Sequence, residues 1–286
     1  MNAFEVPEVD YEQYTNRQLA TVPLAVLGLA ILVLIGWWAF TGAPVTPGID
    51  FTGGTELTVQ TSMSQSDIRA SFDTAPISVQ GVAGESNQYV LRFQSSDSQA
   101  IRQQAQDAEM NVLSSASTAP SFGAGAQQTA VLGVGIAFLG MSLLVFGLFR
   151  TFVPSIAVVI SAFSDIVIPL AAMNVLGIKL SLGTVAALLM LIGYSVDSDI
   201  LLNNHILRRS GSFYDSVDRA MQTGVTMTVT SLAAMAVMAL VATFYSIDLM
   251  ASIGIVLVIG LAADLMNTYL LNLSLLRWYK FEGINR

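Results

Sequence analysis

The sequence has no cysteine, a single histidine and only two lysines, Lys179 and Lys280, among its 286 residues. The absence of cysteine excludes a disulfide-stapled fold and a thiolate metal site. Charged residues make up 11% of the chain and hydrophobic residues 53%, with a mean hydropathy of +0.64. A chain this poor in charge is too apolar for an ordinary soluble domain, and its composition is typical of a polytopic membrane protein.

The charges that are present are mostly acidic. The sequence has twenty acidic and twelve basic residues, which gives a formal net charge of -8 and a sequence pI of about 4.5. An acidic, lysine-poor surface stays hydrated in concentrated salt, where repulsion between like charges is screened. The composition therefore indicates a salt-adapted source.

Six apolar runs are long enough to cross a ~30 Å hydrocarbon core. They lie near residues 20–40, 128–149, 152–176, 182–205, 224–244 and 249–276. The first run follows an acidic tail, is longer than the core of a signal peptide and has no small-residue cleavage site after it. We therefore expect it to remain as an anchor, in a polytopic α-helical membrane protein with six transmembrane helices.

Basic residues in short segments gather on one side of this six-span layout. They are Arg17, Arg150, Arg208, Arg209, Arg219, Arg277, Lys280 and Arg286, against Lys179 alone in the short loops opposite. The positive-inside rule then places both termini in the cytoplasm of a multi-pass protein of the cell membrane. The expected segments are cytoplasmic tails at 1–18 and 278–286, a first transmembrane helix at 19–40, an extracytoplasmic domain at 41–126, and helices two to six at 127–277.

The segment expected outside the membrane, 41–126, differs in composition and is predicted to fold as a small domain. Residues 56–60 and 89–93 alternate apolar and polar side chains as half-buried strands do. A short helix is predicted between them, and a second helix over 98–113. This β-α-β-β-α order indicates an α+β domain of ferredoxin-like type. The run 114–126, rich in Ser, Ala and Gly, is expected to be a flexible connector back to the membrane.

The fourth apolar run carries acids and amides at membrane depth, namely Asp197, Asp199, Asn203 and Asn204. Ionisable groups at that depth are expensive, usually face a protein interior and commonly mark an ion or substrate path. The alternative is that they hold neighbouring helices together through satisfied hydrogen bonds. The run favours a protein driven by ions over a simple anchor.

Three carboxylates are predicted at a common depth. With a helical rise of ~1.5 Å per residue, Asp165, Asp197 and Asp264 lie roughly 22, 16 and 20 Å from the nearest cytoplasmic arginine. The inner half of the fifth span adds a polar track of threonines that includes Thr226. We expect these side chains to share one layer, because scattered helix-bridging residues have no reason to coincide in depth.

The two acids of the fourth span point to different sides of the helix. Asp197 and Asn204, seven residues apart, nearly eclipse each other, while Asp199 and Asn203 share the opposite side. We expect Asp197 to line an internal cavity, because Asn204 extends its polar stripe, and Asp199 to be a structural partner. Carboxylates in a low dielectric can exchange protons near neutral pH. Hydroxyl and backbone oxygens would equally suit a cation, so H⁺ and Na⁺ both stay open.

Three motifs resemble those of the SecD/SecF family of protein-export proteins. The run Gly48-Ile49-Asp50-Phe51-Thr52-Gly53-Gly54-Thr55, just outside the first span, resembles the signature that opens the extracytoplasmic domain in the SecF branch. The run from Gly193 to Asp199 resembles the fourth-span motif of the family, and Phe163-Ser164-Asp165 resembles its acidic third-span motif. The likeness covers essentially the whole chain, and the acidic, lysine-poor composition looks haloarchaeal.

The resemblance implies membership of the RND (resistance-nodulation-division) superfamily, as a six-span half that pairs with SecD. Such a complex uses a proton or sodium gradient to help pull a translocating polypeptide through the Sec protein-conducting channel. The resemblance implies no enzyme activity, catalytic residue, metal or bound cofactor, and contacts with membrane lipid but not with nucleic acid. The ion-coupling residues that we expect are Asp197, Asp165, Asp199, Asp264, Asn204 and Thr226.

Two positions depart from the bacterial pattern of the family. Bacterial SecF has its fourth-span acid where this chain has Ser198, and an arginine in span five where this chain has Thr226. An acid and arginine pair is therefore missing here, or its cation comes from elsewhere. Two alternatives stay open: an RND-type half-transporter for a lipid or small molecule, and a passive scaffold in which the acids only hold helices together. The small outer domain leaves little room for the porter subdomains that such a transporter needs.

Overall fold

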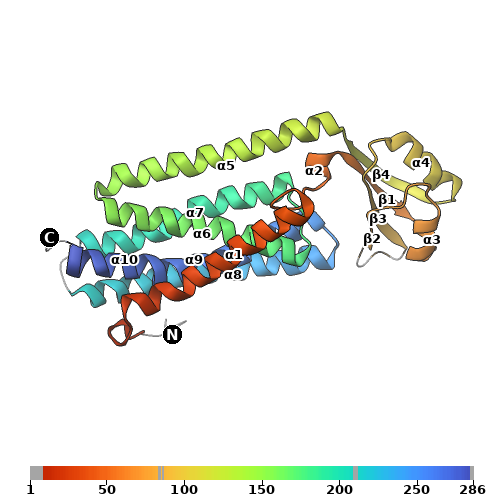
Figure 1. Cartoon of the computed structure of the whole chain (residues 1–286). Helices are drawn as coiled ribbons and strands as arrows, with labels where there is room; N and C mark the ends of the chain where they lie inside the picture. Colours follow the sequence, from red (N-terminus) through yellow and green to blue (C-terminus); the bar gives the residue numbers. More distant parts are fainter. Residues whose placement is uncertain (1–8, 83–84, 86, 209–211, 284–286) are drawn as a thin grey trace, which may run out of the picture.

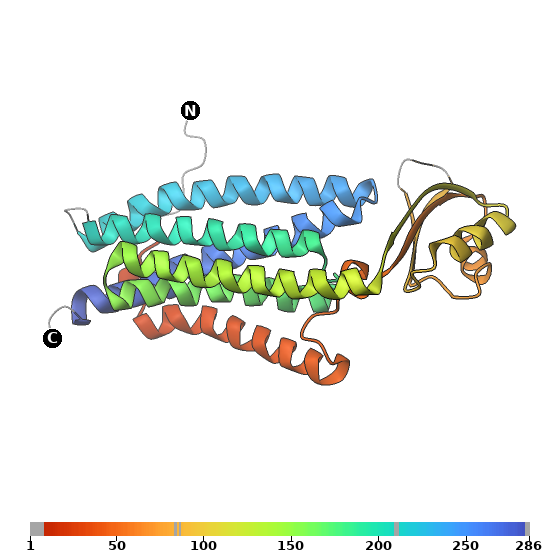
Figure 2. The ribbon, with the colours of Figure 1, turned by 90° about the horizontal axis from the view of Figure 1, so that it is seen from above.

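The computed structural model describes residues 9–82, 85, 87–208 and 212–283 (Figure 1). A long helical bundle carries a small domain of strands and helices at one end. Seen from above, α1 lies along one side of the bundle and α8 along the other, with α7 between them (Figure 2). Arg209 and Arg286, used above for orientation, and residues 1–8 of the predicted N-terminal tail lie outside the described residues.

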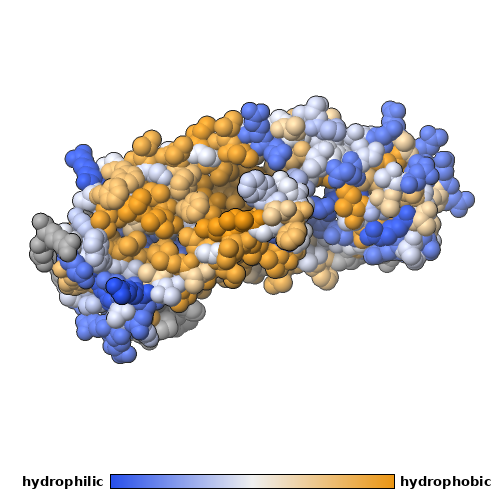
Figure 3. All heavy atoms as spheres, in the orientation of Figure 1, coloured by the Kyte–Doolittle hydropathy of each residue, from blue (hydrophilic) through white to orange (hydrophobic). Residues whose placement is uncertain are grey.

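Within the described ranges, six helical units are long and apolar enough to cross a membrane. They are α1 (Asn16–Thr41), α5 (Pro120–Phe149), α6 (Phe152–Leu176), α7 (Leu182–Arg208), α8 (Phe213–Phe244) and the unit that begins with α9 (Asp248–Met266). A broad apolar surface covers the bundle between more hydrophilic ends (Figure 3). The prediction of six transmembrane helices is confirmed.

The helices begin where side chains or proline suit a free helix end. Thr15 and Gln18 form a capping box at the start of α1, in which the Thr15 amide donates to Gln18 Oε1 over 2.8 Å. Ser212 Oγ accepts from the amide of Asp215 at the start of α8 (3.0 Å). Pro120 takes the first position of α5, where its missing N–H would have no helical partner.

The sixth unit is not a uniform α-helix. After α9 the chain forms a π-helical segment, η2 (Asn267–Asn272), then α10 (Leu273–Trp278) and a second π-helical turn, η3 (Tyr279–Gly283). Hydrogen bonds in a π-helix close over five residues, so each turn is wider than in an α-helix. The apolar run at 249–276 predicts the span but contains no signal for this change of helix type.

The outer domain contains a four-stranded antiparallel sheet in the order β2-β3-β1-β4. Its strands are β1 (Gly54–Gln60), β2 (Ser78–Gly81), β3 (Gln88–Phe93) and β4 (Asn111–Thr118), and its helices are α3 (Gln65–Ala70) and α4 (Ser98–Asp107). The β-α-β-β-α-β succession confirms the expected ferredoxin-like α+β class. Inward-facing side chains of β1 and β3, such as Leu57 and Leu91, pack with Ile68 and Ile101 from the helices.

Two predictions for the end of this domain are wrong. The helix predicted over 98–113 ends at Asp107, because Glu109 has a left-handed φ of 62° and β4 begins at Asn111. The expected flexible connector at 114–126 is instead the end of β4, paired with β1, followed by the first turns of α5. Serine and threonine suit an edge strand, so composition alone misleads here. Ala119 is the one residue between β4 and α5, which makes the link to the membrane short.

The Gly48–Thr55 motif forms the junction between the outer domain and the bundle. Its middle is a single helical turn, α2 (Ile49–Thr52), which packs against the start of α5. A Cβ atom added at Gly53 would lie 2.8 Å from the backbone nitrogen of Pro120, and Gly53 also has a φ of +78°. Glycine is therefore required at this point for steric and conformational reasons.

The contact between α8 and α9 depends on a second glycine. A Cβ atom added at Gly254 would lie 2.9 Å from the Cβ and 3.0 Å from the backbone nitrogen of Ala239. We expect Gly254→Ala to destabilise the bundle by about 1–3 kcal/mol, the usual cost of overpacking. The midpoint of thermal unfolding in detergent should fall accordingly.

The matched control is Gly135→Ala on α5, an exposed position with nothing within 4 Å of the added methyl group. This substitution should leave the midpoint unchanged or raise it slightly, because alanine has the higher helix propensity. Equal midpoints for the two variants would contradict the close approach of α8 and α9.

Candidate functional site: a buried carboxylate cluster

Three carboxylates from three different helices are buried inside the bundle. Asp165 on α6, Asp199 on α7 and Asp264 on α9 have exposed fractions of 1%, 0% and 1%. Hydroxyl and amide side chains join them. We call the following residues the carboxylate cluster: Asp165, Asp199, Asp264, Ser195, Ser198, Asn267, Thr268 and Asn272.

Asp165 is held by one donor on each carboxylate oxygen. Ser195 Oγ on α7 donates to Asp165 Oδ2 over 2.6 Å, and Asn267 Nδ2 on η2 donates to Asp165 Oδ1 over 2.6 Å. Hydrogen bonds to an ionised group are short and strong. Asp165 therefore ties α6 to both α7 and the π-helical segment.

Asp199 and Asp264 lie on either side of one hydroxyl group. Thr268 Oγ1 is 2.8 Å from Asp199 Oδ1 and 3.4 Å from Asp264 Oδ1. Asn272 Nδ2 also donates to Asp199 Oδ1 (2.8 Å), and Ser198 Oγ donates to Asp264 Oδ1 (2.8 Å). A threonine hydroxyl has one proton, so it can donate fully to only one of the two acids at a time.

Asp199 has one oxygen without a partner. Thr268 and Asn272 both donate to Oδ1, whereas Oδ2 is buried and makes no hydrogen bond of normal length among the described residues. The nearby hydroxyl of Ser161 on α6, also buried, interacts with this carboxylate at longer range. A buried acceptor without a donor is costly, and each such atom in a folded protein calls for an explanation. Protonation of Asp199 at Oδ2 would neutralise the carboxylate and so remove the cost of a buried charge.

Among the described residues, no basic side chain forms an ion pair with the cluster: the ion pairs involve Arg92 with Glu56 and with Asp248. Removing an ion from water costs several kcal/mol, and neighbouring like charges add repulsion. Ionisation of all three acids at once is therefore unfavourable.

The cluster offers both donors and acceptors. The partners of Asp165 and Asp199 are hydroxyl or amide donors, while the side-chain oxygens of Asn267 and Asn272 are buried without a hydrogen-bond partner. Within the part of the chain that the structure describes, no group of three or more His, Cys, Asp or Glu residues is arranged to hold a metal ion.

The predicted assignment of the two faces of α7 is reversed. Asp197 is exposed on the surface of the bundle, and Asp199 is the fully buried acid. The interior stripe consists of Ser195, Ser198, Asp199 and Asn203, spaced three and four residues apart. This stripe is visible in the sequence and is longer than the Asp197–Asn204 stripe, so counting serines as well as acids and amides would have identified the interior face.

Two further predicted residues lie outside the cluster. Thr226 is exposed on α8, and its hydroxyl donates to the backbone oxygen of Gln222 over 2.6 Å. The predicted polar track thus satisfies its hydroxyls largely along its own helix. Asn204 is half-buried, and no hydrogen bond joins it to the cluster among the described residues. Of the three acids predicted to share a layer, Asp165 and Asp264 do meet, with Asp199 in place of Asp197.

Sequence reasoning missed the residues of η2 entirely. Asn267, Thr268 and Asn272 supply donors to all three buried acids. Thr268 and Asn272 follow Asp264 at intervals of four residues, which places the three on one helical face, so this polar stripe is visible in the sequence. Asn267 lies beside that stripe and contacts Asp165 instead.

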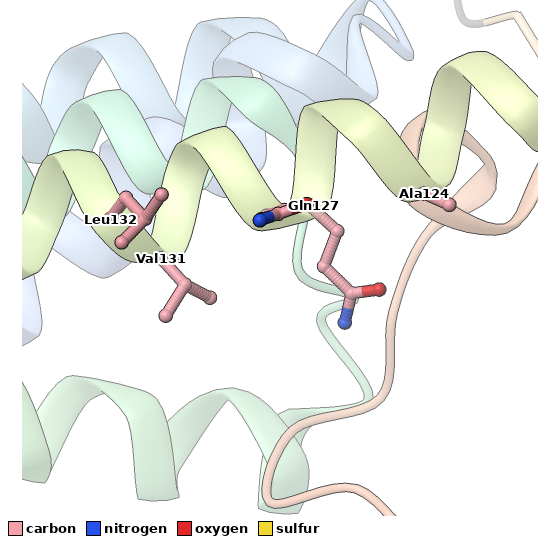
Figure 4. Close-up of a pocket in the computed structure, with 5 residues that line it drawn as sticks. Ala124, Gln127, Val131 and Leu132 are labelled. Carbon is pink, nitrogen blue, oxygen red and sulfur yellow. The ribbon is translucent and has the colours of Figure 1, made fainter.

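A shallow pocket lies elsewhere, at the outer half of α5 (Figure 4). It is lined by Ala124, Gln127, Gln128, Val131 and Leu132. All five residues come from one helix, and none is ionisable. The carboxylate cluster is therefore the better candidate for function.

The sequence matches two protein-family models. The model "Protein export membrane protein SecD/SecF, C-terminal" matches residues 97–282, and the "SecD/SecF GG Motif" matches residues 38–65. The second match includes the whole Gly48–Thr55 motif.

Curated relatives share the full length of the chain. The protein-export membrane protein SecF of Haloferax volcanii is 63% identical over 288 residues, covering 100% of both chains. SecF of Haloquadratum walsbyi is 61% identical with the same coverage, and SecF of Pyrococcus furiosus is 38% identical over 93% of each chain. The two relatives above 60% identity are haloarchaeal, as the composition indicates.

Solved structures of SecDF have the same fold. SecDF from Thermus thermophilus, described as a translocon-associated membrane protein, matches 96% of this chain with a TM-score of 0.69 and 20% identity. SecDF in a super-membrane-facing form matches 99% with a TM-score of 0.59. The match spans 39% and 40% of those longer chains. With its family-model matches and its full-length relatives, the chain belongs to the SecF branch of the SecD/SecF family of protein-export membrane proteins.

Proposed function

We propose that this protein works with SecD as an accessory of the Sec channel and couples an ion gradient to late steps of polypeptide export across the cell membrane. Membership of the export family supports the process. The observation that carries the coupling step is the carboxylate cluster, in which three buried acids have no basic partner among the residues that the structure describes. A site of this kind changes its energy whenever an ion enters or leaves.

The coupling ion in this proposal is the proton, and Asp199 Oδ2 is the atom that accepts it. Hydroxyl and amide donors already contact Asp199 Oδ1, while Oδ2 has none. A sodium ion would require several oxygen lone pairs directed towards one point. Among the described residues no three His, Cys, Asp or Glu side chains are arranged around such a point, which supports the proton.

The Thr268 hydroxyl can donate to either Asp199 or Asp264, and its choice of acceptor depends on the charge of Asp199. When Asp199 is ionised, the hydroxyl donates to it over the shorter distance of 2.8 Å. When Asp199 is neutral, the same hydroxyl is free to turn towards Asp264, which is 3.4 Å away. That turn removes the hydrogen bond between η2 and α7 and so allows the two to repack, which is the mechanical step of the proposal.

The partner surface lies on the face of α7 opposite the cluster. Ala186, Met190, Gly193 and Asp197 recur there at helical spacing, and all are exposed. An acid exposed to lipid in the middle of a span is costly, whereas glycine permits the close approach of another helix. We therefore propose that SecD covers this face. The solved SecDF chains are longer than the part that matches this chain, which is compatible with a second half beside it.

Both termini are placed in the cytoplasm in this proposal, which puts the outer domain on the side where an exported polypeptide emerges. Arg150 and Arg277 at the end of the bundle remote from the outer domain support this orientation through the positive-inside rule.

The passive-scaffold alternative predicts that secretion does not depend on the charge of the cluster. Secretion in an Asp199→Asn strain therefore separates the scaffold from the coupling role.

Asp199→Asn should abolish the gradient-dependent part of secretion. Asparagine has nearly the same shape but cannot ionise, so the charge change that drives repacking is lost. The free energy of unfolding should stay the same or rise, because a buried ionisable group without a cation is removed. The measurement is secretion of a reporter at equal expression, with and without an uncoupler, together with co-purification of SecD.

The control for that experiment is Asp107→Asn, an equivalent substitution at an exposed position at the end of α4. A strain that carries Asp107→Asn should secrete the reporter as well as the strain with the unmodified protein. Unchanged, uncoupler-sensitive secretion in the Asp199→Asn strain would refute the coupling role and leave the scaffold alternative.

A cysteine placed on the proposed SecD face should cross-link to SecD. The chain has no cysteine of its own, so Met190→Cys gives a single reactive site on the exposed stripe of α7. Leu32→Cys on α1 is the matched control, because Leu32 is similarly exposed (67% against 57%) and α1 runs along the opposite side of the bundle from α8 (Figure 2). Cross-linking through residue 32 but not residue 190 would place SecD on the wrong face for this account.

A further inference from the structure

The outer end of α7 is held by an acid from the Gly48–Thr55 motif. Asp50 Oδ2 accepts from the backbone N–H of Leu182 over 3.0 Å. Leu182 is the first residue of α7, so its N–H has no partner within the helix. A carboxylate at a helix N-terminus also interacts favourably with the helix dipole. The bond links residues 132 positions apart in the sequence.

The backbone around Asp50 strengthens the same attachment. The amide of Gly48 donates to the oxygen of Leu180 over 2.7 Å, and the amide of Leu180 donates to the oxygen of Thr46 over 2.8 Å. Asn174 on α6 also donates to the oxygen of Pro44 (2.8 Å). The segment before β1 is thus paired with the α6–α7 loop, and movement of α7 along its axis reaches it directly.

The outer end of α9 forms an ion pair with an arginine of the sheet. Asp248 is the first residue of α9, and its Oδ2 lies 2.6 Å from Arg92 Nη1 on β3. Arg92 also bonds Glu56 on β1 through Nε (2.8 Å). Although burial lowers the pKa of Arg92, Glu56 and Asp248 raise it above its ordinary value, so the cation persists. Ser246, in the turn before α9, adds a hydrogen bond to the oxygen of Gly81 (2.7 Å).

The same two helices carry the acids that share Thr268. Asp199 lies 17 residues beyond Leu182 on α7, and Asp264 lies 16 residues beyond Asp248 on α9, which corresponds to roughly 26 and 24 Å of helix. The covalent links to the outer domain are different: they run through α1 and α5, which carry no member of the carboxylate cluster. The non-covalent contacts at Asp50 and Arg92 therefore provide the direct route from the cluster.

We propose that Asp50 and Arg92 are positioning residues that convert a relative displacement of α7 and α9 into a tilt of the outer domain. The inference rests on the proposed function for the source of the displacement. Both contacts reach one small sheet, because α2 leads into β1 and β3 pairs with β1. If one helix slides against the other, the two attachment points move by different amounts and the sheet must rotate (Figure 1).

The test measures the outer domain in the intact SecD–SecF complex, made with a cysteine-free SecD. Spin labels are attached at Arg102→Cys on α4 and Gln128→Cys on α5, both exposed, and the distance between them is measured by pulsed electron resonance. Asp199→Asn should shift the mean distance by about 2 Å, the scale of helix displacements in switching proteins. In Asp50→Ala and in Arg92→Gln the same Asp199→Asn substitution should produce less than half of that shift.

Asp107→Asn is the control, because it removes a charge from the outer domain at a position without a contact to the bundle, and it should leave the full shift in place. Circular dichroism and SecD co-purification check that each variant is folded. A full shift in both Asp50→Ala and Arg92→Gln would overturn the linkage while leaving the displacement of the proposed function intact. The absence of any shift on Asp199→Asn would instead contradict the displacement itself, so the two failures are distinguishable.

Discussion

The burial of three carboxylates, with no basic partner among the described residues, is the constraint on which the rest of the account depends. Asp165, Asp199 and Asp264 are removed from water, and hydrogen bonds from serine, threonine and asparagine offset part of the cost. Neutral donors cannot cancel the net charge of ionised acids. In the function that we propose, the bundle is therefore most stable when the site contains bound positive charge, and its packing changes when that charge leaves.

In the function that we propose, the π-helical segment η2 converts the change of charge into a change of helix packing. Thr268 and Asn272 donate to Asp199 on α7, while Asn267 donates to Asp165 on α6, so the segment is hydrogen-bonded to two helices. A wider helical turn has weaker backbone geometry than an α-helix and is often found at functional sites. The close contact of α8 with α9 at Gly254 and the contacts of the outer domain with α7 and α9 define which parts of the molecule can move with it.

Most of the fold can be predicted from the sequence, because span length, charge asymmetry and strand alternation are local signals. The six spans and the ferredoxin-like domain follow from them. The end of that domain could not be predicted, since the serine-rich residues before Pro120 have the composition of a linker and become a strand only by pairing with β1. Long-range pairing of this kind leaves little trace in the local sequence.

The site was half predictable for similar reasons. Depth along the helices identifies Asp165 and Asp264, but depth does not say which face of α7 is buried. The serines at 195 and 198 contain that information, because they repeat with Asp199 at helical spacing. Thr268 and Asn272 repeat with Asp264 every four residues and could likewise have been found, whereas the change to a π-helix at Asn267 leaves no periodic signal in the sequence.

The central claim is that the carboxylate cluster exchanges protons, and infrared difference spectroscopy of the SecD–SecF complex during a pH titration tests it most directly. The account predicts a band from a protonated carboxylic acid that titrates with pH and is lost or reduced in Asp199→Asn, while Asp107→Asn leaves it unchanged. A spectrum in which no protonated carboxyl band changes with pH, or in which the band is unaffected by Asp199→Asn, would contradict the account.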